Sequence, residues 1–278
     1  MARKYTISCK GKLIDLSIPK VMGIVNITPD SFFDGGKNNS IDDALAQVQK
    51  HLDHGAAFID VGGYSTRPDA SLVSVEEENL RVIPVIKQIV TSFPDACISI
   101  DTFNSKVALQ AVEAGACIIN DISGGDFDSN MFTTLKQVQV PYVLMHSKGS
   151  LNKMHQKPQY ANVTQEVILK LSAKLEELSY LGINDIIVDP GFGFAKNLDH
   201  NFELLKKLEQ LQILNKPILT GISRKSMIFK TLESNAVNAL NGTTVLNTIA
   251  LQKGATILRV HDSKEASEAI TLTTKVYH

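Results

Sequence analysis

Eight short apolar runs alternate with helical patterns along this 278-residue chain, and this alternation restricts its fold more than any other feature. The runs are VMGIVNI, FIDVGG, CISID, CIINDI, YVLMH, IIVDPG, ILTGIS and ILRVH. Between the first two, Ile41, Leu45, Val48 and Leu52 recur at helical spacing. Repeated strand–helix units predict a parallel sheet covered by helices. Eight of them predict an α/β fold of the closed (β/α)8 TIM-barrel type, with an open, doubly wound sheet as the alternative.

A weak internal repeat supports the same unit. GAAFIDV, GACIIND and GATILRV each place a glycine, an alanine and then an apolar run in the same order. Gly55, Gly115 and Gly182 stand where helices are expected to end. Ser40 and Ser74 are each followed by an acidic residue three positions later, which predicts capping boxes at two helix starts.

The first twenty residues do not follow the alternation. KYTISCK, GK and LIDLSIP predict a short β-hairpin that covers the bottom of the barrel. No low-complexity segment or linker divides the rest. We therefore expect one domain over residues 1–278, with the hairpin in 1–20 and the barrel in 21–278.

The composition excludes several classes of partner. A formal net charge of -1 argues against nucleic acid or a membrane surface as the main partner. No stretch approaches the ~20 apolar residues of a membrane span. MARKYTISCK lacks the apolar core of a signal peptide, so a cytoplasmic location is expected. Cys9, Cys97 and Cys117 are an odd number without metal-like spacing, so reduced thiols that serve as packing residues are expected.

The ends of the apolar runs carry polar side chains, and in such barrels the carboxyl ends of the strands carry the chemistry. In chain order these residues are Asn26, Asp60, Asp101, Asn120, Asp121, His146, Asp189, Ser223, Arg259 and His261. Their shared position predicts one site at the rim. Two structural alternatives stay open. In one, Asp60 or Asp121 serves only to cap the turn that follows it, and in the other, His146 is a structural histidine.

The chemistry of these groups indicates the ligand. Asp101, Asn120 and Asp189 offer acceptors and an amide donor, which suit a planar heterocycle with several N–H groups. Positive donors that suit phosphate or carboxylate groups are Arg67, Lys225, Arg259 and His261. Side chains that can cover a ring, or equally pack in the core, are Phe32, Phe33, Met145, Phe192 and Phe194. Lysine is unfavourable at a helix start, so Lys225 in SRKSMI favours a functional role over a solvated one.

Eight motifs, in order over about residues 21–265, resemble those of the dihydropteroate synthase family. They are GIVNITPDSFFDGG, STRP, SIDT, NDISG, LMH, VDPGFGF, SRKSMI and RVHD. The resemblance implies a (β/α)8 barrel and a transferase of folate biosynthesis. Its reaction condenses 6-hydroxymethyl-7,8-dihydropterin pyrophosphate with p-aminobenzoate, giving 7,8-dihydropteroate and pyrophosphate. The resemblance further implies Mg²⁺ as cofactor and a homodimer formed through the helices around the seventh and eighth strands.

The resemblance also implies residue roles. The implied pterin site is Asp101, Asn120, Met145, Asp189, Phe194, Gly221 and Lys225. The implied pyrophosphate site is Asn26, Arg67, Arg259 and His261, with Mg²⁺ near Asn26. The implied p-aminobenzoate pocket, where sulfonamides compete, is Phe32, Thr66, Arg67, Pro68, Ser223 and Lys225. The implied catalytic residues are Asp101, Lys225, Arg259 and His261.

Two departures fall on the second of the family's two mobile loops. This chain has GGYSTRPDA where many members have GGESTRPG, so Tyr64 replaces a glutamate and Asp69 a glycine. The pterin motifs are intact, so the activity is expected, whereas p-aminobenzoate affinity and sulfonamide sensitivity are left open.

The aromatic amine of p-aminobenzoate is neutral at pH 7, so the reaction needs no strong base. Stabilising the charge of the leaving pyrophosphate is the harder problem, and we expect Mg²⁺, Arg259 and His261 to do it. Asp101 and Asp189 would favour a cationic methylene, which predicts a dissociative, SN1-like path.

Two other functions compete with the synthase. Pterin-binding barrels also serve as methyl-carrier domains, but these do not need STRP or SRKSM, and both are present. An aldolase-type barrel would need a Schiff-base lysine on an inner strand position, whereas Lys225 follows the seventh strand.

Overall fold

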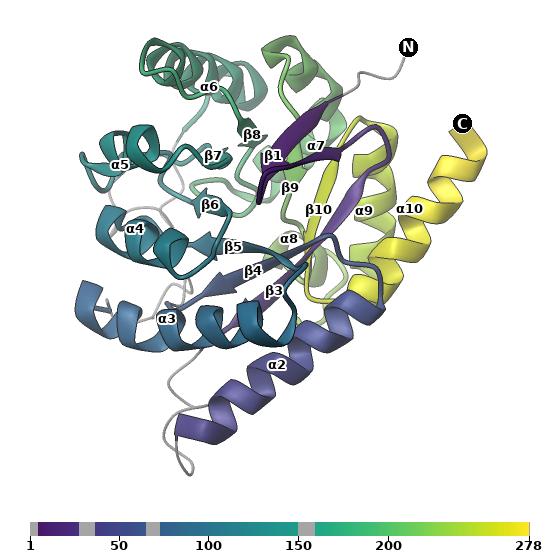
Figure 1. The fold of residues 1–278 in the computed structure, drawn as a ribbon. Coiled ribbons are helices and arrows are strands. Elements are labelled where there is room, and N and C mark those ends of the chain that lie inside the picture. Colours follow the sequence, from purple (N-terminus) through teal and green to yellow (C-terminus); the bar gives the residue numbers. More distant parts are fainter. Residues whose placement is uncertain (1–4, 28–36, 65–72, 150–158, 278) are drawn as a thin grey trace.

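The computed structural model describes residues 5–27, 37–64, 73–149 and 159–277, with only the backbone of 37–40. Within them, eight parallel strands form one sheet (Figure 1). The strands are β3 (Lys20–Asn26), β4 (Phe58–Gly62), β5 (Cys97–Asp101), β6 (Ile118–Asp121), β7 (Tyr142–Met145), β8 (Ile186–Asp189), β9 (Leu219–Thr220) and β10 (Ile257–Val260). Their order is β8-β7-β6-β5-β4-β3-β10-β9, and a parallel bridge between Val188 and Ile218 joins the two edges. The TIM barrel is confirmed, and the open doubly wound sheet is wrong.

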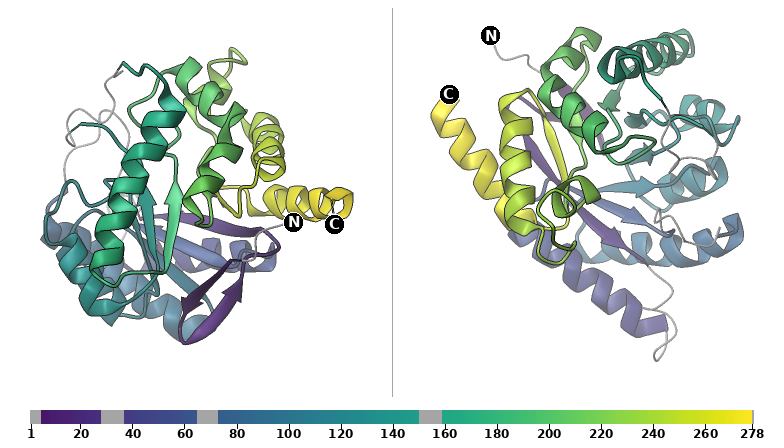
Figure 2. Two further views of the ribbon diagram at one scale, coloured as in Figure 1. Left: turned by 90° about the horizontal axis from the view of Figure 1, so that it is seen from above. Right: turned by 180° about the vertical axis from the view of Figure 1, so that it is seen from behind.

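Helices cover the outside of the barrel (Figures 1 and 2). They are α2 (Lys37–Asp53), α3 (Val75–Ser92), α4 (Ser105–Glu113), α5 (Met131–Val138), α6 (Val163–Tyr180), α7 (Leu198–Lys206), the 3-10 helix η2 (Leu208–Leu214), α8 (Ser226–Phe229), α9 (Leu240–Gln252) and α10 (Ser263–Tyr277). In the described ranges, no helix is both long enough and apolar enough to cross a membrane.

Local sequence accounts for where these helices begin and end. The side chain of Ser74 accepts a hydrogen bond from the Glu77 backbone N–H at 3.1 Å and so caps α3 as predicted. The predicted cap at Ser40 is wrong, because α2 begins three residues earlier and Ser40 is therefore inside the helix and not at its N-cap. Gly55, Gly115 and Gly182 follow α2, α4 and α6 with φ of 80°, 112° and 78°, which confirms their predicted role in ending helices.

The N-terminal hairpin closes the end of the barrel where the strands begin. β1 (Thr6–Cys9) pairs antiparallel with β2 (Lys12–Asp15). Ile7 and Leu16 are fully buried against residues at the strand starts, such as Phe58 and Met22. Burying each of these two side chains contributes roughly 1.5–3 kcal/mol. The predicted hairpin is confirmed.

The three cysteines differ from their expectation. Cys9 of the hairpin and Cys117, just before β6, form a disulfide with a Cα–Cα distance of 5.5 Å, and Cys97 is a free thiol. The expectation of three reduced thiols is therefore wrong. Its basis was spacing along the chain, whereas the hairpin brings residue 9 beside a residue 108 positions away.

Candidate active site

The carboxyl ends of the barrel strands bring the predicted polar residues to one rim. Asp101 and Asp189 are the last residues of β5 and β8, and Asn120 is the penultimate residue of β6. Asp101 pairs in register with Asn120 on the neighbouring strand. Two positions differ from prediction: Asp60 lies in the middle of β4, and Ser223 lies three residues beyond the short β9.

Arg259 is the centre of a buried ionic cluster. Its Nε donates to Asp60 Oδ2 and its Nη2 to Asp101 Oδ2, both at 2.6 Å. Asn120 Nδ2 donates to the same Asp60 oxygen at 2.9 Å. Asp60 therefore pairs with a cation across the barrel, and the interpretation of Asp60 as a turn cap is wrong. Its other carboxylate oxygen is buried without a hydrogen-bond partner among the described residues.

Tyr64 contributes a contact that sequence reasoning missed. Its hydroxyl donates to Asp101 Oδ1 at 3.0 Å, and its ring meets Phe103 edge-on at 5.0 Å between centroids. Burial raises the pKa of Asp101, Arg259 opposes this shift, and Asp60 adds to it. Burial raises the pKa of Tyr64 as well, so the phenol keeps its proton and acts as the donor. The departure of Tyr64 from the family pattern was the one available signal.

Asp189 begins the glycine-rich loop after β8. Its Oδ1 accepts the Gly191 N–H at 2.7 Å. Burial raises the pKa of Asp189, while the nearby Lys225 ammonium opposes the shift. Lys225 Nζ donates to the carbonyl of Phe192 and lies 4.6 Å from the centroid of the Phe194 ring. Burial lowers the pKa of Lys225 to about 8. The Asp189 carboxylate, an acceptor, and the Lys225 ammonium, a donor, therefore lie close to each other at the rim.

Two glycines of this loop have positive φ angles, and one of them also approaches another backbone segment closely. Gly191 has φ of 71°, and a Cβ there would lie 2.1 Å from the carbonyl oxygen of His146. Gly193 has φ of 83°, and its Cβ would lie 3.1 Å from Lys225 Cδ. A Cβ at position 191 would overlap a backbone carbonyl, whereas at position 193 the positive φ favours glycine and the Lys225 side chain would have to shift slightly.

Lys196 is a second residue that sequence reasoning missed. Its ammonium is buried and donates to the carbonyls of Gly191 and Phe194 at 2.9 and 3.1 Å, and it contacts His146 Nδ1 at 3.1 Å. Burial lowers the pKa of Lys196 to about 7. Burial and Lys196 lower the pKa of His146 to about 2, so this histidine is neutral. These contacts agree with the interpretation of His146 as a structural histidine.

The loops after β9 and β10 are tied together. Ser223 Oγ lies 3.1 Å from His261 Nδ1 and accepts the His261 backbone N–H at 3.2 Å. Beside them, Arg224 forms a two-pronged ion pair with Asp262, with both contacts at 2.8 Å. Burial and the Arg259 guanidinium lower the pKa of His261. Lys225 occupies the N-cap position of the four-residue helix α8 without a side-chain capping hydrogen bond.

The remaining predicted residues divide into three groups. Met145 and Phe194 pack with Ile122 in a small apolar cluster. Gly221 and Asn26 lie close to other rim residues. A Cβ added to Gly221 would be 3.8 Å from the Lys225 ammonium, and a Cβ added to Gly62 would be 3.7 Å from the side-chain oxygen of Asn26. Those outside the described residues are Phe32, Phe33, Thr66, Arg67, Pro68 and Asp69.

Phe192 and Asp121 make contacts that stabilise the fold. Phe192 is fully buried in the main core. Asp121 accepts hydrogen bonds from the backbone of Ser123 and Gly125 at 2.7 and 2.9 Å, so it holds the turn after β6, as the capping interpretation requires.

Comparison with known proteins gives consistent matches. The family model for pterin binding enzymes matches residues 22–261. Dihydropteroate synthase from Escherichia coli (strain K12) is 43% identical over 263 residues, covering 94% of this chain and 93% of that protein. Among solved structures, dihydropteroate synthase from Yersinia pestis in complex with a sulfonamide drug is 39% identical with a TM-score of 0.91, covering 98% of this chain and 99% of that one. Dihydropteroate synthase from Xanthomonas albilineans with 4-aminobenzoic acid is 38% identical, also at 0.91, covering 99% and 98%.

Proposed function

This chain belongs to the dihydropteroate synthase family, and from that premise we propose its reaction. It is a transferase of folate biosynthesis that joins 6-hydroxymethyl-7,8-dihydropterin pyrophosphate to p-aminobenzoate. The products are 7,8-dihydropteroate and pyrophosphate. The observation that carries the proposal is the rim itself, where buried carboxylates and an amide face Lys225 and Arg259 within one barrel mouth.

Binding of the pterin follows from this donor and acceptor set. Asp189 and Asp101 supply carboxylate oxygens for ring N–H groups, and Asn120 supplies both a donor and an acceptor. Lys225, over the ring of Phe194, supplies a donor to a ring carbonyl or nitrogen. Met145 and Phe194 provide the apolar surface on which the ring lies.

The proposed pyrophosphate site is next to the pterin site, because Arg259 contacts Asp101. Arg259 and His261 are its proposed donors, because they lie within and immediately after β10 at the same rim. Asn26 presents an exposed side chain at the end of β3, close to Gly62. One neutral oxygen ligand fits Mg²⁺, which is commonly held by few protein oxygens together with substrate phosphates and water. When bound, Mg²⁺ would neutralise charge on the pyrophosphate oxygens.

Carbon–oxygen bond cleavage before amine attack is the proposed path. The buried carboxylates of Asp101 and Asp189 would stabilise positive charge spreading from the methylene into the pterin ring. Asp60 offsets much of the Arg259 charge on the inner side of the guanidinium. Soaking crystals of the protein with pterin pyrophosphate and Mg²⁺, but without p-aminobenzoate, and determining the structure tests this path. An ionised pterin beside free pyrophosphate supports it, and an intact substrate over long soaks argues for direct displacement.

We propose that Ser223 and Lys225 line the pocket for the amine substrate. The STRP residues predicted for the same pocket lie outside the described residues. The Xanthomonas albilineans relative was solved with 4-aminobenzoic acid and the Yersinia pestis relative with a sulfonamide drug. We therefore propose that sulfonamides compete at this pocket. A Dixon analysis with sulfamethoxazole against p-aminobenzoate tests the competition.

A homodimer is proposed through the helices around β9 and β10. Large apolar side chains are exposed there: Leu232, Val237, Val245, Leu272, Val276 and Tyr277. Light scattering of the wild type and of Val245→Glu tests this face, with a monomeric variant as the supporting result. The cytoplasmic location stays a prediction, which cell fractionation would test.

Identifying the product separates the synthase from its competitors. Purified chain is given pterin pyrophosphate, Mg²⁺ and ¹⁵N-amino p-aminobenzoate, and the mixture is analysed by mass spectrometry. Dihydropteroate that carries the ¹⁵N label supports the proposal. Tight pterin binding without this product would favour a methyl-carrier domain instead.

A further inference from the structure

The three cysteines of the chain meet at the closed end of the barrel, far from the rim. Cys9, Cys97 and Cys117 each offer a sulfur, and the three sulfurs lie within 4.8 Å of one another. They come from β1, the first position of β5 and the residue before β6. Cys9 and Cys117 are buried and bonded to each other, whereas Cys97 is a partly exposed free thiol. The proposed transferase chemistry uses none of them.

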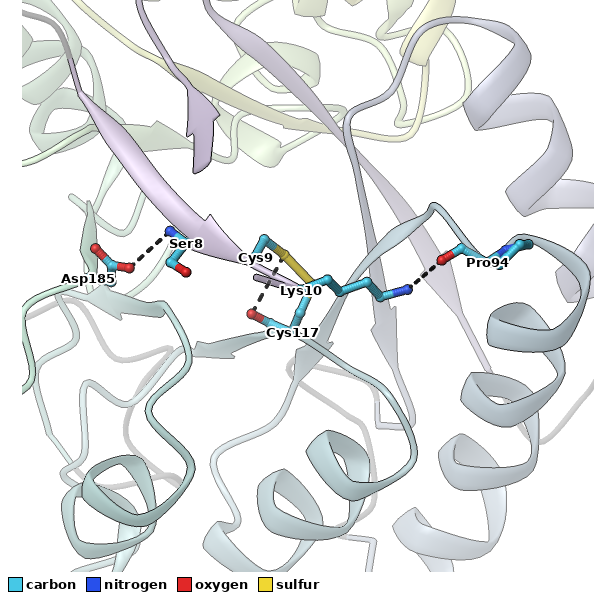
Figure 3. The surroundings of a disulfide bond; sticks show 6 residues. All are labelled: Ser8, Cys9, Lys10, Pro94, Cys117 and Asp185. Carbon is cyan, nitrogen blue, oxygen red and sulfur yellow. Dashed lines mark hydrogen bonds between the residues drawn. A yellow bond between two sulfur atoms is a disulfide. The ribbon is translucent and has the colours of Figure 1, made fainter. Parts of the chain in front are cut away.

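The hairpin places these sulfurs together through several contacts. The Ser8 backbone N–H donates to Asp185 before β8 at 2.9 Å, and Lys10 Nζ donates to the Pro94 carbonyl before β5 at 3.1 Å (Figure 3). The disulfide lies between these two anchors. Lys12 contacts Asp95 at 3.3 Å on the same side. The hairpin strand that carries Cys9 is therefore anchored to the barrel on both sides of the disulfide.

A disulfide with a third thiol at this distance has a specific chemistry. Thiolates exchange with neighbouring disulfides, and the rate depends on access and on the thiolate fraction. Burial raises the pKa of the Cys97 thiol, and the ammonium groups of Lys10 and Lys12 partly offset this shift. An accessible third thiol beside a buried pair gives external thiols and disulfides an entry point.

We propose that Cys9, Cys97 and Cys117 form a thiol–disulfide exchange site that links the N-terminal hairpin reversibly to the barrel. The Cys97 thiolate attacks Cys117 Sγ, a Cys97–Cys117 bond forms, and the Cys9–Cys117 bond breaks. The electron pair of the broken bond leaves on Cys9, which takes up the proton that Cys97 lost. This exchange is neither an oxidation nor a reduction. Formation of the first disulfide oxidises two thiols and reduces one small disulfide of the glutathione class to two thiols.

The position of the bond decides what is tied together. A bond from Cys9 to either partner ties the hairpin to the barrel. A Cys97–Cys117 bond joins β5 to the start of β6, which are already neighbours, and leaves the hairpin without a disulfide to the barrel. The exchange site would therefore set how firmly the hairpin closes the barrel end.

The test maps disulfides in the full-length chain after equilibration with oxidised glutathione, using alkylation and mass spectrometry of non-reduced digests. Of the three thiols, the wild type should keep one. Its digest should contain mostly Cys9–Cys117 peptides and a minor fraction with Cys97 in the bridge. Cys9→Ser and Cys117→Ser should each lose both remaining thiols to a new bridge that includes Cys97, whereas Cys97→Ser should keep the Cys9–Cys117 bridge and contain no free thiol. Oxidation in guanidinium is the control, in which bridge formation should be at least tenfold slower.

Three results would overturn the proposal. One is a wild type that keeps three free thiols. Another is a pair of variants, Cys9→Ser and Cys117→Ser, that keep both thiols while circular dichroism shows native folding. The third is stoichiometric zinc or copper in the purified chain, with all three thiols protected until chelation, which would make the cluster a metal site. The wild-type digest keeps the test decisive if a variant fails to fold.

Discussion

The guanidinium of Arg259 joins two buried carboxylates from different strands, since its Nε reaches Asp60 and its Nη2 reaches Asp101 at equal distances of 2.6 Å. Asp60 lies in the middle of β4 and Asp101 at the end of β5. The arginine is thus oriented from the interior of the barrel toward the mouth. The same two contacts link β10 to β4 and β5 and fix the position of Arg259 in the candidate site.

Replacing Arg259 with Met should destabilise the chain and slow catalysis. Two carboxylates would stay buried without their cation, which costs about 3–5 kcal/mol in the free energy of unfolding. Loss of a donor to the leaving pyrophosphate should lower kcat about 10²- to 10³-fold. Urea unfolding and steady-state kinetics measure the two effects. Lys253→Met is the control, because its pair with Glu209 is more exposed and should contribute at most about 1 kcal/mol. Equal losses in both variants would contradict the assignment.

Replacing Asp189 with Ala should weaken pterin pyrophosphate binding about 10- to 100-fold, since a charged hydrogen-bond acceptor is worth about 1.5–3 kcal/mol. Titration calorimetry measures the affinity. Asp121→Asn is the matched control: Asp121 also ends a buried strand, but its carboxylate holds the turn after β6. We expect this control to lose stability and keep its affinity. An unchanged affinity in Asp189→Ala would remove Asp189 from the pterin site.

Replacing Tyr64 with Phe should move the pH profile of kcat/KM for pterin pyrophosphate. The Tyr64 hydroxyl stabilises the ionised form of Asp101, so it lowers the pKa of that carboxyl against the effect of burial. Without the hydroxyl the pKa of Asp101 rises, and the acidic limb of the profile moves to higher pH. Phe103→Leu, which alters packing on the same ring and leaves the hydrogen bond, should not move the limb. A profile identical to that of the wild type would show that Asp101 ionisation does not limit binding.

Replacing Lys196 with Met should change how stability depends on pH. Burial lowers the pKa of Lys196 to about 7, whereas an unfolded lysine titrates near 10.4. Between these values the unfolded chain binds more protons, so this lysine makes wild-type stability rise with pH. Lys196→Met should lack this part of the rise and also lose three buried contacts. Urea midpoints at several pH values between 7 and 10 measure the slope, with the more exposed Lys206→Met as control. If the stability of Lys196→Met rose with pH as steeply as that of the wild type, Lys196 would have the same charge in the folded and unfolded chains.

Periodic features of the sequence predicted the architecture well. The alternation of apolar runs and helical faces is a local property, so it identified the barrel and the helix ends at Gly55 and Gly182, and the break in the alternation before residue 21 identified the hairpin. Topology then predicted the rim, because carboxyl ends of parallel strands must meet. This is why Asp101, Asn120 and Asp189 are brought together as expected.

Contacts between distant segments were beyond the sequence pattern. Asp60 and Arg259 are 199 residues apart, and nothing local marks Asp60 as the partner of that arginine. The buried Lys196 follows a glycine-rich loop in which a lysine reads as solvated. Cys9 and Cys117 meet because the hairpin folds over the strand starts. Their separation of 108 residues along the chain does not indicate this contact.

Pyrophosphate release by the purified chain tests the central claim most directly. The reaction contains pterin pyrophosphate and Mg²⁺, with and without p-aminobenzoate, and pyrophosphate and dihydropteroate are measured together. Release that requires both substrates, with one pyrophosphate for each dihydropteroate, is the predicted result. No release above the rate without enzyme, from protein that still binds the pterin, would contradict the account.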